Sequence, residues 1–156
     1  MALLTAHGVK QLVDVRTAPG SRRHPHFAGT ALTESLPQAG IDYRWVKELG
    51  GRRRPRPDSP NVGWRNESFR GYADHMQSPE FALAVEELIE SGHDGDLAIM
   101  CAEAVPWRCH RSLIGDALLV RGARVLDIMT PHKAPAHRLT RFAQVEGTNI
   151  TYPAER

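Results

Sequence analysis

The chain has 156 residues, which is long enough for one domain with a buried core and too short for two domains of ordinary size. Hydrophobic residues make up 41% and charged residues 24% of it, as in a folded globular protein, and the formal net charge of +2 excludes no class of partner. No apolar run approaches the roughly 20 residues that a membrane span needs, and the N-terminus lacks the layout of a signal peptide. We therefore expect a single domain over residues 1–156, located in the cytoplasm, with no membrane partner.

The first half of the chain predicts helices and strands in alternation. Gly8 and Gly40 suit the position just after a helix, and Thr30 is a residue type that caps a helix start. An apolar run ends in two polar residues, Asp14 and Arg16, as a buried strand does where it reaches a sheet edge. The expected elements are a helix over residues 1–7, a strand over 9–16, a helix over 30–38 and a strand over 41–46.

Residues 47–67 carry no periodic pattern and include the basic run Arg52–Arg56. Loops of this length are usually lids, binding segments or disordered, so we expect this one to be mobile before it meets a partner. Arginines with Trp45 and Trp64 nearby suit contact with the backbone and bases of nucleic acid. A nucleic-acid-associated binding module is therefore one alternative function, although a GC-rich genome explains the same wealth of arginine.

The second half continues the alternation. Ser68 is expected to begin a short helix to residue 76, and Ser78 with Pro79 has the signature of a helix start, in this case a helix ending at Gly92. The remaining expected elements are a strand over 96–101, a helix over 109–121, a strand over 124–129 and a terminal hairpin of 142–145 with 149–152. Strands that alternate with helices indicate a single-domain α/β sandwich with a mainly parallel sheet flanked by helices.

Chemistry-bearing residues gather where the strand over 96–101 leads into the helix over 109–121. In open α/β sheets, ligands bind at the carboxyl ends of strands. Cys109 falls in the expected first turn of the helix, where the helix dipole and cationic neighbours lower the pKa of a thiol. The candidate catalytic residues are Cys101, Glu103, Cys109 and His110, and the candidate ligand-binding residues are Asp14, Arg16, Arg22, Trp107, Arg108 and Arg111.

Several of these residues have a purely structural alternative. Cys109 is also suited to packing as a small apolar residue between helix and sheet. Glu103, the candidate proton carrier, also suits neutralising a nearby arginine, and Trp107 suits anchoring its loop to the core. Asp14 with Arg16 is either part of the site or an exposed ion pair of little energetic weight.

The two cysteines leave three chemical states open. In a reducing compartment they are more typical of free thiols than of a structural disulfide, although the seven residues between Cys101 and Cys109 leave room for a reversible one. A zinc site would add His110 and either His132 or His137, but its spacing departs from the usual C-x₂₋₄-C pattern. We therefore predict no metal and no cofactor.

Six stretches in the same order resemble a known family. They are Leu12–Arg16, Pro19–Arg22, Glu48–Gly51, Phe69–Tyr72, Cys101–Glu103 and Trp107–Arg111, and they are similar to the uncharacterised bacterial and archaeal family called domain of unknown function 488. The resemblance covers nearly the whole chain and implies an α/β domain with a polar Asp-Val-Arg unit and a Cys–Glu…Cys-His-Arg unit, but no established reaction. Members usually begin with an extra strand, which we expect this chain to lack.

A weaker likeness is to rhodanese-type and cysteine-phosphatase folds, in which a cysteine precedes an anion-cradling loop of the pattern Cys-x₅-Arg. Six residues separate Cys101 from Arg108 here. The residues and the resemblance together predict an anion-binding pocket for a small phosphate- or carboxylate-bearing ligand, with a reactive thiol, in a thiol-dependent transferase or hydrolase. The alternatives are the nucleic-acid-binding module and a non-catalytic regulatory protein. The sequence decides neither whether the chain is an enzyme nor its oligomeric state.

Overall fold

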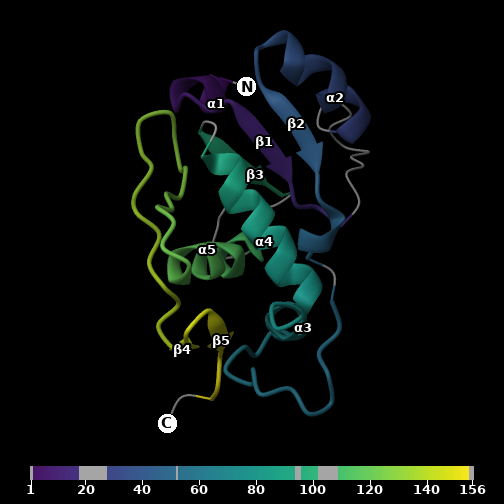
Figure 1. The fold of residues 1–156 in the computed structure, drawn as a ribbon, viewed down its shortest axis with the longest axis vertical. Coiled ribbons are helices and arrows are strands. Elements are labelled where there is room, and N and C mark those ends of the chain that lie inside the picture. Colours follow the sequence, from purple (N-terminus) through teal and green to yellow (C-terminus); the bar gives the residue numbers. More distant parts are fainter. Residues whose placement is uncertain (1, 18–27, 52, 94–95, 102–108, 155–156) are drawn as a thin grey trace.

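A parallel sheet of three strands lies at the centre of the molecule (Figure 1). The structure is a computed structural model that describes residues 2–17, 28–51, 53–93, 96–101 and 109–154. Strand β1 lies between β2 and β3 and pairs parallel with both, so that Asp14 is level with Trp45 on one side and with Met100 on the other. The carboxyl ends of the three strands therefore meet at one edge of the sheet.

The helices and strands follow the order that the sequence predicts, with one exception. Their bounds are α1 Ala2–Ala6, β1 Gln11–Asp14, α2 Gly29–Gln38, β2 Asp42–Trp45, the short 3₁₀ helix η2 Lys47–Leu49, α3 Glu67–His75, α4 Pro79–Gly92, β3 Leu97–Met100, α5 Arg111–Val120, β4 Gln144–Glu146 and β5 Asn149–Thr151. The predicted α/β class, with a mainly parallel sheet flanked by helices and a C-terminal hairpin, is confirmed.

Alternate residues of β1 enter two separate cores, because successive side chains of a strand point to opposite faces. Leu12 packs with Leu32 and Leu36 of α2 on one face of the sheet. Val13 and Val15 belong to a larger core on the other face, which includes buried side chains of α3, α4, α5 and the C-terminal hairpin. Helices thus cover both faces, and the sheet edge carrying the polar residues lies between these layers.

Two helices begin earlier than predicted. Helix α2 starts at Gly29 after Ala28, which makes no side-chain cap, so the prediction that Thr30 is the capping residue is wrong. Helix α3 starts at Glu67 rather than at Ser68, because the Oδ1 of Asn66 accepts the backbone N–H groups of residues 68 and 69. The cap of α4 is as predicted, since the Oγ of Ser78 accepts the backbone N–H of Phe81.

The strand predicted over residues 124–129 does not join the central sheet. This segment instead turns back and pairs with the residues that follow it, through isolated antiparallel bridges between Leu126 and Ala136 and between Thr130 and Lys133. Leu126 is 44% exposed, so the segment lacks the burial of a central strand. The terminal hairpin is confirmed, with Gly147 at φ +64° in the turn between β4 and β5.

The irregular segment 47–67 is tied to the body of the protein in its described part, which corrects the expectation of a mobile loop. The carboxylate of Asp74, on α3, accepts hydrogen bonds from the backbone N–H of Arg56, the hydroxyl of Ser59 and the side-chain amide of Asn61. Asn61 is fully buried, and its own Oδ1 accepts the backbone N–H of Tyr152. One buried carboxylate thus joins this segment to α3, and through Asn61 to the C-terminal hairpin.

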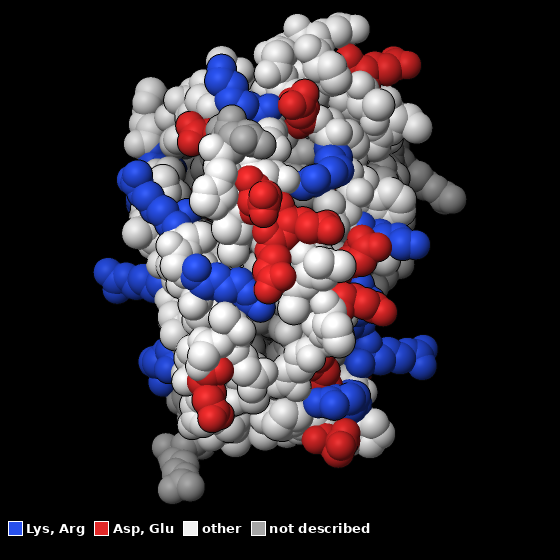
Figure 2. Space-filling view, in the orientation of Figure 1, with Lys and Arg blue, Asp and Glu red and all other residues white. Residues whose placement is uncertain are grey.

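Charge is unevenly spread over the surface. Figure 2 shows carboxylates grouped over α4, whose acidic residues are Glu80, Glu86, Glu87 and Glu90, with Lys and Arg side chains around them. In the part of the chain that the structure describes, we find no helix with the length and apolar character of a membrane span.

Candidate functional site

The first polar group at the sheet edge is a buried ion pair. The Nε of Arg16 donates to Oδ1 and Oδ2 of Asp14 at 2.9 and 3.0 Å, and its Nη2 donates to Oδ2 at 2.5 Å. The side chains of Asp14 and Arg16 are 0% and 7% exposed, so the alternative of a solvent-exposed ion pair is wrong. The Tyr43 hydroxyl also donates to Asp14, and burial, followed by this hydrogen bond, raises the pKa of Tyr43 to about 12.

This arrangement limits what Arg16 can do for a ligand. Hydrogen bonding to Asp14 raises the pKa of the guanidinium above its ordinary value, against the effect of burial. The backbone carbonyl of Arg16 accepts the indole N–H of Trp45 at 2.8 Å. The guanidinium is therefore directed mainly at Asp14, and this ion pair fixes the chain where β1 ends. Fewer of its N–H groups are left to bind an external anion.

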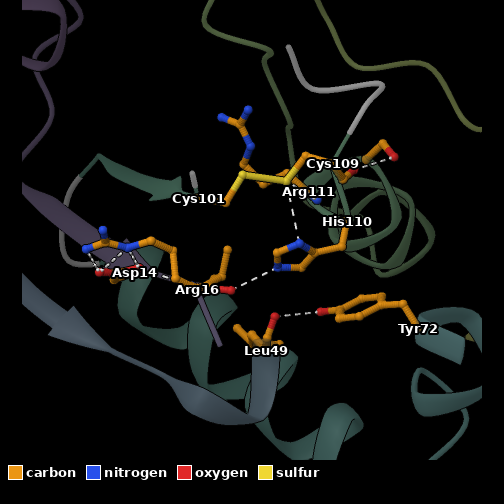
Figure 3. Close-up of a disulfide and its surroundings, with 10 residues drawn as sticks. Asp14, Arg16, Leu49, Tyr72, Cys101, Cys109, His110 and Arg111 are labelled. Atoms are coloured by element: carbon orange, nitrogen blue, oxygen red, sulfur yellow. Dashed lines mark hydrogen bonds and ion pairs between the residues drawn. A yellow bond between two sulfur atoms is a disulfide. The ribbon is translucent and has the colours of Figure 1, made fainter. Parts of the chain in front are cut away.

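The second group is the cysteine pair. Cys101 follows directly after β3 and Cys109 lies just before α5, and the structure joins their sulfurs in a disulfide (Figure 3). The sequence favoured free thiols, and the structure shows the disulfide that the sequence left as an alternative. Cys109 is 5% exposed, whereas Cys101 is partly exposed.

His110 lies between this disulfide and strand β1. Its Nε2 is 2.9 Å from the backbone carbonyl of Val15, and because a carbonyl only accepts, Nε2 carries the proton. Its Nδ1 is 3.5 Å from the Sγ of Cys109. Burial lowers the pKa of His110, so at neutral pH the ring is uncharged and the lone pair of Nδ1 points at the sulfur (Figure 3).

Two neighbours hold the imidazole in this orientation. A Cβ added to Gly51 would lie 2.5 Å from Nδ1 of His110, so only glycine allows the ring to approach so closely. On another side, the ring of Tyr72 packs at 4.9 Å between ring centroids. The Tyr72 hydroxyl is buried and donates to the carbonyl of Leu49 at 2.9 Å, which fixes this aromatic wall.

The start of α5 places backbone N–H groups at the sulfur. The helix begins at Arg111 with His110 as the preceding cap residue, so the prediction that Cys109 lies in the first turn is wrong by two residues. The carbonyl of Cys109 accepts the N–H and the hydroxyl of Ser112, both at 3.1 Å. The N–H of Arg111 points at the Sγ of Cys109, 3.4 Å away, as in a cap, so the helix terminus still favours negative charge on this sulfur.

Four of the predicted site residues lie outside the described residues: Arg22, Glu103, Trp107 and Arg108. The described part of the predicted anion site therefore consists of Arg111, beside the disulfide, and the Asp14–Arg16 pair. Two surface hollows lined by described residues lie elsewhere, one between Arg44 and α4 and one beside Pro37 and β2. The anion pocket stays a prediction.

The arginine-rich segment gives the nucleic-acid alternative no support. The guanidinium of Arg53 donates to the carbonyls of Gly50, Lys47 and Glu48, and that of Arg70 donates to the carbonyls of Trp64 and Arg65. Trp64 packs edge-on against the rings of Phe69 and Phe142. These three side chains thus stabilise the fold locally, whereas Trp45, Arg54 and Arg56 are exposed.

The zinc alternative is also wrong for this form of the protein, because both cysteine sulfurs are consumed in the disulfide. His137, one of its proposed ligands, lies in a different polar cluster. Its Nε2 is 2.9 Å from Asp116 on α5, and its Nδ1 is 3.1 Å from Asp127. Burial alone would lower the pKa of His137, but the hydrogen bonds and charges of the two carboxylates outweigh it and raise the pKa.

The sequence interpretation missed the residues that orient the site. Gly51 and Tyr72 end two of the stretches that carry the family resemblance, which was a usable signal, but neither was given a role. Tyr43 was counted only as part of an alternating strand. The carbonyl of Val15, which fixes the tautomer of His110, gives no signal in a sequence at all.

Comparisons with curated proteins and with solved structures gave no match, so the likeness to rhodanese-type and cysteine-phosphatase folds gains no support. A comparison with family models gave one match. The model described as domain of unknown function DUF488 matches residues 1–118, which include the Asp14–Arg16 pair, both cysteines and His110. Since these residues are more than half of the 156, the chain belongs to this DUF488 family.

Proposed function

We propose that this chain is a thiol-dependent enzyme, a transferase or hydrolase, that acts on a small ligand carrying a phosphate or carboxylate group. The observation that carries the proposal is the position of His110 between the Val15 carbonyl and the Cys109 sulfur. With Nε2–H held by the carbonyl, Nδ1 is the nitrogen that accepts the thiol proton once the disulfide is reduced. Cys109 is then the thiolate and His110 is its base.

Three further features support a stabilised thiolate at Cys109. The N–H of Arg111 points at the sulfur, and the N-terminus of α5 contributes its partial positive charge. Arg111 also brings a guanidinium, the group best suited to a phosphate or carboxylate, next to the thiol. A cytoplasmic location, which belongs to this proposal, would supply the reducing conditions that open the disulfide.

The test is the pKa of each cysteine in the fully reduced protein, taken from the pH dependence of the alkylation rate with the modified residue identified by mass spectrometry. We expect Cys109 to titrate well below the roughly 8.5 of an ordinary thiol. The variant His110→Asn should move this pKa back up, because the base is lost. His93→Asn, an exposed histidine that follows α4, is the matched control and should leave it unchanged.

The ligand half of the proposal is tested in the same assay. Inorganic phosphate should slow the alkylation of Cys109 in the wild type, and Arg111→Gln should abolish this protection. An ordinary pKa at Cys109 that does not respond to His110→Asn would refute the thiolate, and an absence of protection by phosphate and by small carboxylates would refute the anion site.

A further inference from the structure

We infer that the two cysteines form a thiol–disulfide exchange centre in which a small external thiol attacks Cys101 and Cys109 is the sulfur that leaves. This inference rests on the proposed function and names its substrate class, which is low-molecular-weight thiols and their disulfides. The disulfide joins Cys101, directly after β3, to Cys109, two residues before α5, so both sulfurs lie at the predicted ligand edge of the sheet (Figure 3).

The first step of the argument is the unequal exposure of the two sulfur-bearing residues. Cys109 is 5% exposed and packs under the start of α5, whereas Cys101 is partly open to solvent. Exchange requires the incoming thiolate to approach one sulfur along the line of the disulfide bond, so access selects the sulfur that is attacked. The open residue is Cys101.

The second step is the unequal stability of the two possible leaving groups. If Cys101 is attacked, negative charge appears on Cys109, where the backbone N–H of Arg111 lies 3.4 Å away and the N-terminus of α5 adds its partial positive charge. The thiol with the lower pKa leaves faster. Access and leaving-group stability therefore favour the same direction of attack.

The chemistry balances with two molecules of thiol, RSH. The first thiolate forms a bond to the Cys101 sulfur, the Cys101–Cys109 bond breaks, and its electron pair stays on Cys109, which takes up the proton that RSH released on ionising. A second thiolate attacks the R sulfur of this mixed disulfide, releases RSSR and leaves Cys101 reduced. Two RSH thus supply two electrons and two protons, and the reverse sequence reduces RSSR at the expense of the protein dithiol.

Cellular thiols of this size often carry carboxylates, which agrees with the guanidinium of Arg111 beside the disulfide. Figure 3 draws this side chain on the side of the disulfide away from the His110 ring. The two sides of the disulfide thus differ: an imidazole base lies on one and a cation on the other. Reduced glutathione, which has two carboxylates, is a suitable probe.

The experiment uses the oxidised wild-type protein, so it does not depend on whether a cysteine variant folds. A brief pulse of excess reduced glutathione is stopped with a maleimide, which labels the cysteine that has just been freed. Peptide mapping then counts two species, glutathione on Cys101 with the label on Cys109, and the reverse. We expect the first to exceed the second by about tenfold or more, because access and leaving-group pKa act together.

The same pulse in concentrated guanidinium chloride is the control, since unfolding removes the difference in access and should bring the two species close to equal amounts. An equal split in the native protein, or glutathione mainly on Cys109, overturns the inference. So does a native protein that forms no mixed disulfide when the unfolded protein does, because the disulfide would then be an inert structural bond.

Failure of the exchange centre can be distinguished from failure of the proposed function. If Cys109 titrates low but glutathione is not directed to Cys101, the reactive thiolate survives and the exchange centre fails. If glutathione goes to Cys101 while the pKa of Cys109 is ordinary, exposure alone directs the exchange and the His110-activated thiolate fails.

Discussion

His110 and His137 lie in similar settings, each against a glycine and α5, but their pKa values are shifted in opposite directions. His110 precedes α5, presses against Gly51, and lies between a backbone carbonyl and a cysteine sulfur. His137 packs against Gly115, within α5, and lies between the carboxylates of Asp116 and Asp127. Burial is the largest influence on both pKa values and lowers them, but at His137 the carboxylates more than compensate.

The difference shows what decides the role of a histidine. Burial and the nearby arginines lower the pKa of His110, so its ring stays neutral and keeps a lone pair, which is what a thiol needs in a base. A ring between two carboxylates has its pKa raised, and in its cationic form both nitrogens donate, so it joins parts of the chain and has no lone pair to offer. Three sets of variants test this contrast, from the largest expected effect to the smallest.

Removing the carboxylate of Asp116 should cost the most stability. Asp116 is fully buried and accepts hydrogen bonds from His137, from the backbone N–H of Thr140 and from the hydroxyl of Tyr152. Asp116→Ala leaves all three donors without this partner, and we expect a loss of about 3 kcal/mol or more in the free energy of unfolding. Urea unfolding measures it.

The matched control for this variant is Asp127→Ala. The Asp127 side chain is 28% exposed and bonds to the other nitrogen of the same ring. Its removal should cost about 1 kcal/mol or less, because water can replace the lost contact. Equal losses of unfolding free energy in the two variants would show that burial of the carboxylate does not determine how much this cluster stabilises the fold.

Adding one methyl group beside each histidine should separate the two roles. The new Cβ would lie 2.5 Å from Nδ1 of His110 in Gly51→Ala and 2.8 Å from Nε2 of His137 in Gly115→Ala. We expect each to destabilise the fold by about 1 to 2 kcal/mol through overpacking. Only Gly51→Ala should also raise the pKa of Cys109, because only it displaces the base.

Gly92→Ala is the control for both glycine variants. A Cβ at Gly92, in the last turn of α4, meets nothing within 4 Å, so alanine there should be neutral or should stabilise the helix by up to about 1 kcal/mol. If Gly51→Ala leaves the alkylation pKa of Cys109 where it is in the wild type, the orientation of His110 does not control the thiol.

The smallest effect is a pH dependence of stability at His137. Its pKa is raised in the folded protein, so its protonation stabilises the fold fully below the unfolded pKa of roughly 6.5, and this contribution is lost as the pH rises through the folded pKa. His137→Gln should therefore cost more stability near pH 5.5 than near pH 8.5. A cost that is the same at both pH values would mean that His137 contributes as a neutral ring.

Patterns with a local cause were predictable from the sequence. Ser78 and Pro79 mark the start of α4 because a cap and an N1 proline act within one turn, and the apolar run at β1 indicates a strand that is buried on both faces. The start of α3 was missed because Asn66 and Ser68 are both suited to the cap and Asn66 occupies it, and the start of α2 was missed because it has no side-chain cap at all. The strand over 124–129 failed because its pairing partner is chosen by tertiary structure and not by its own composition.

The candidate site was predictable as a list of residues but not as an arrangement. The sequence placed Cys101, Cys109 and His110 at one strand-to-helix junction, and because the ends of parallel strands meet, it placed Asp14 at the same edge. Whether the sulfurs bond, which nitrogen of His110 bears the proton, and how tightly Asp14 holds Arg16 depend on contacts between distant segments, such as that with the Val15 carbonyl. No local pattern encodes those distances.

The position of Asp116 constrains which amino-acid substitutions this protein can tolerate. The family match ends at residue 118, so Asp116 belongs to the shared body, while the groups it binds lie at positions 137, 140 and 152. Without those partners the buried carboxylate would lack hydrogen-bond donors, and without the carboxylate those partners would lose their acceptor. A substitution at Asp116 is therefore expected to be tolerated only together with changes at the three residues that it binds.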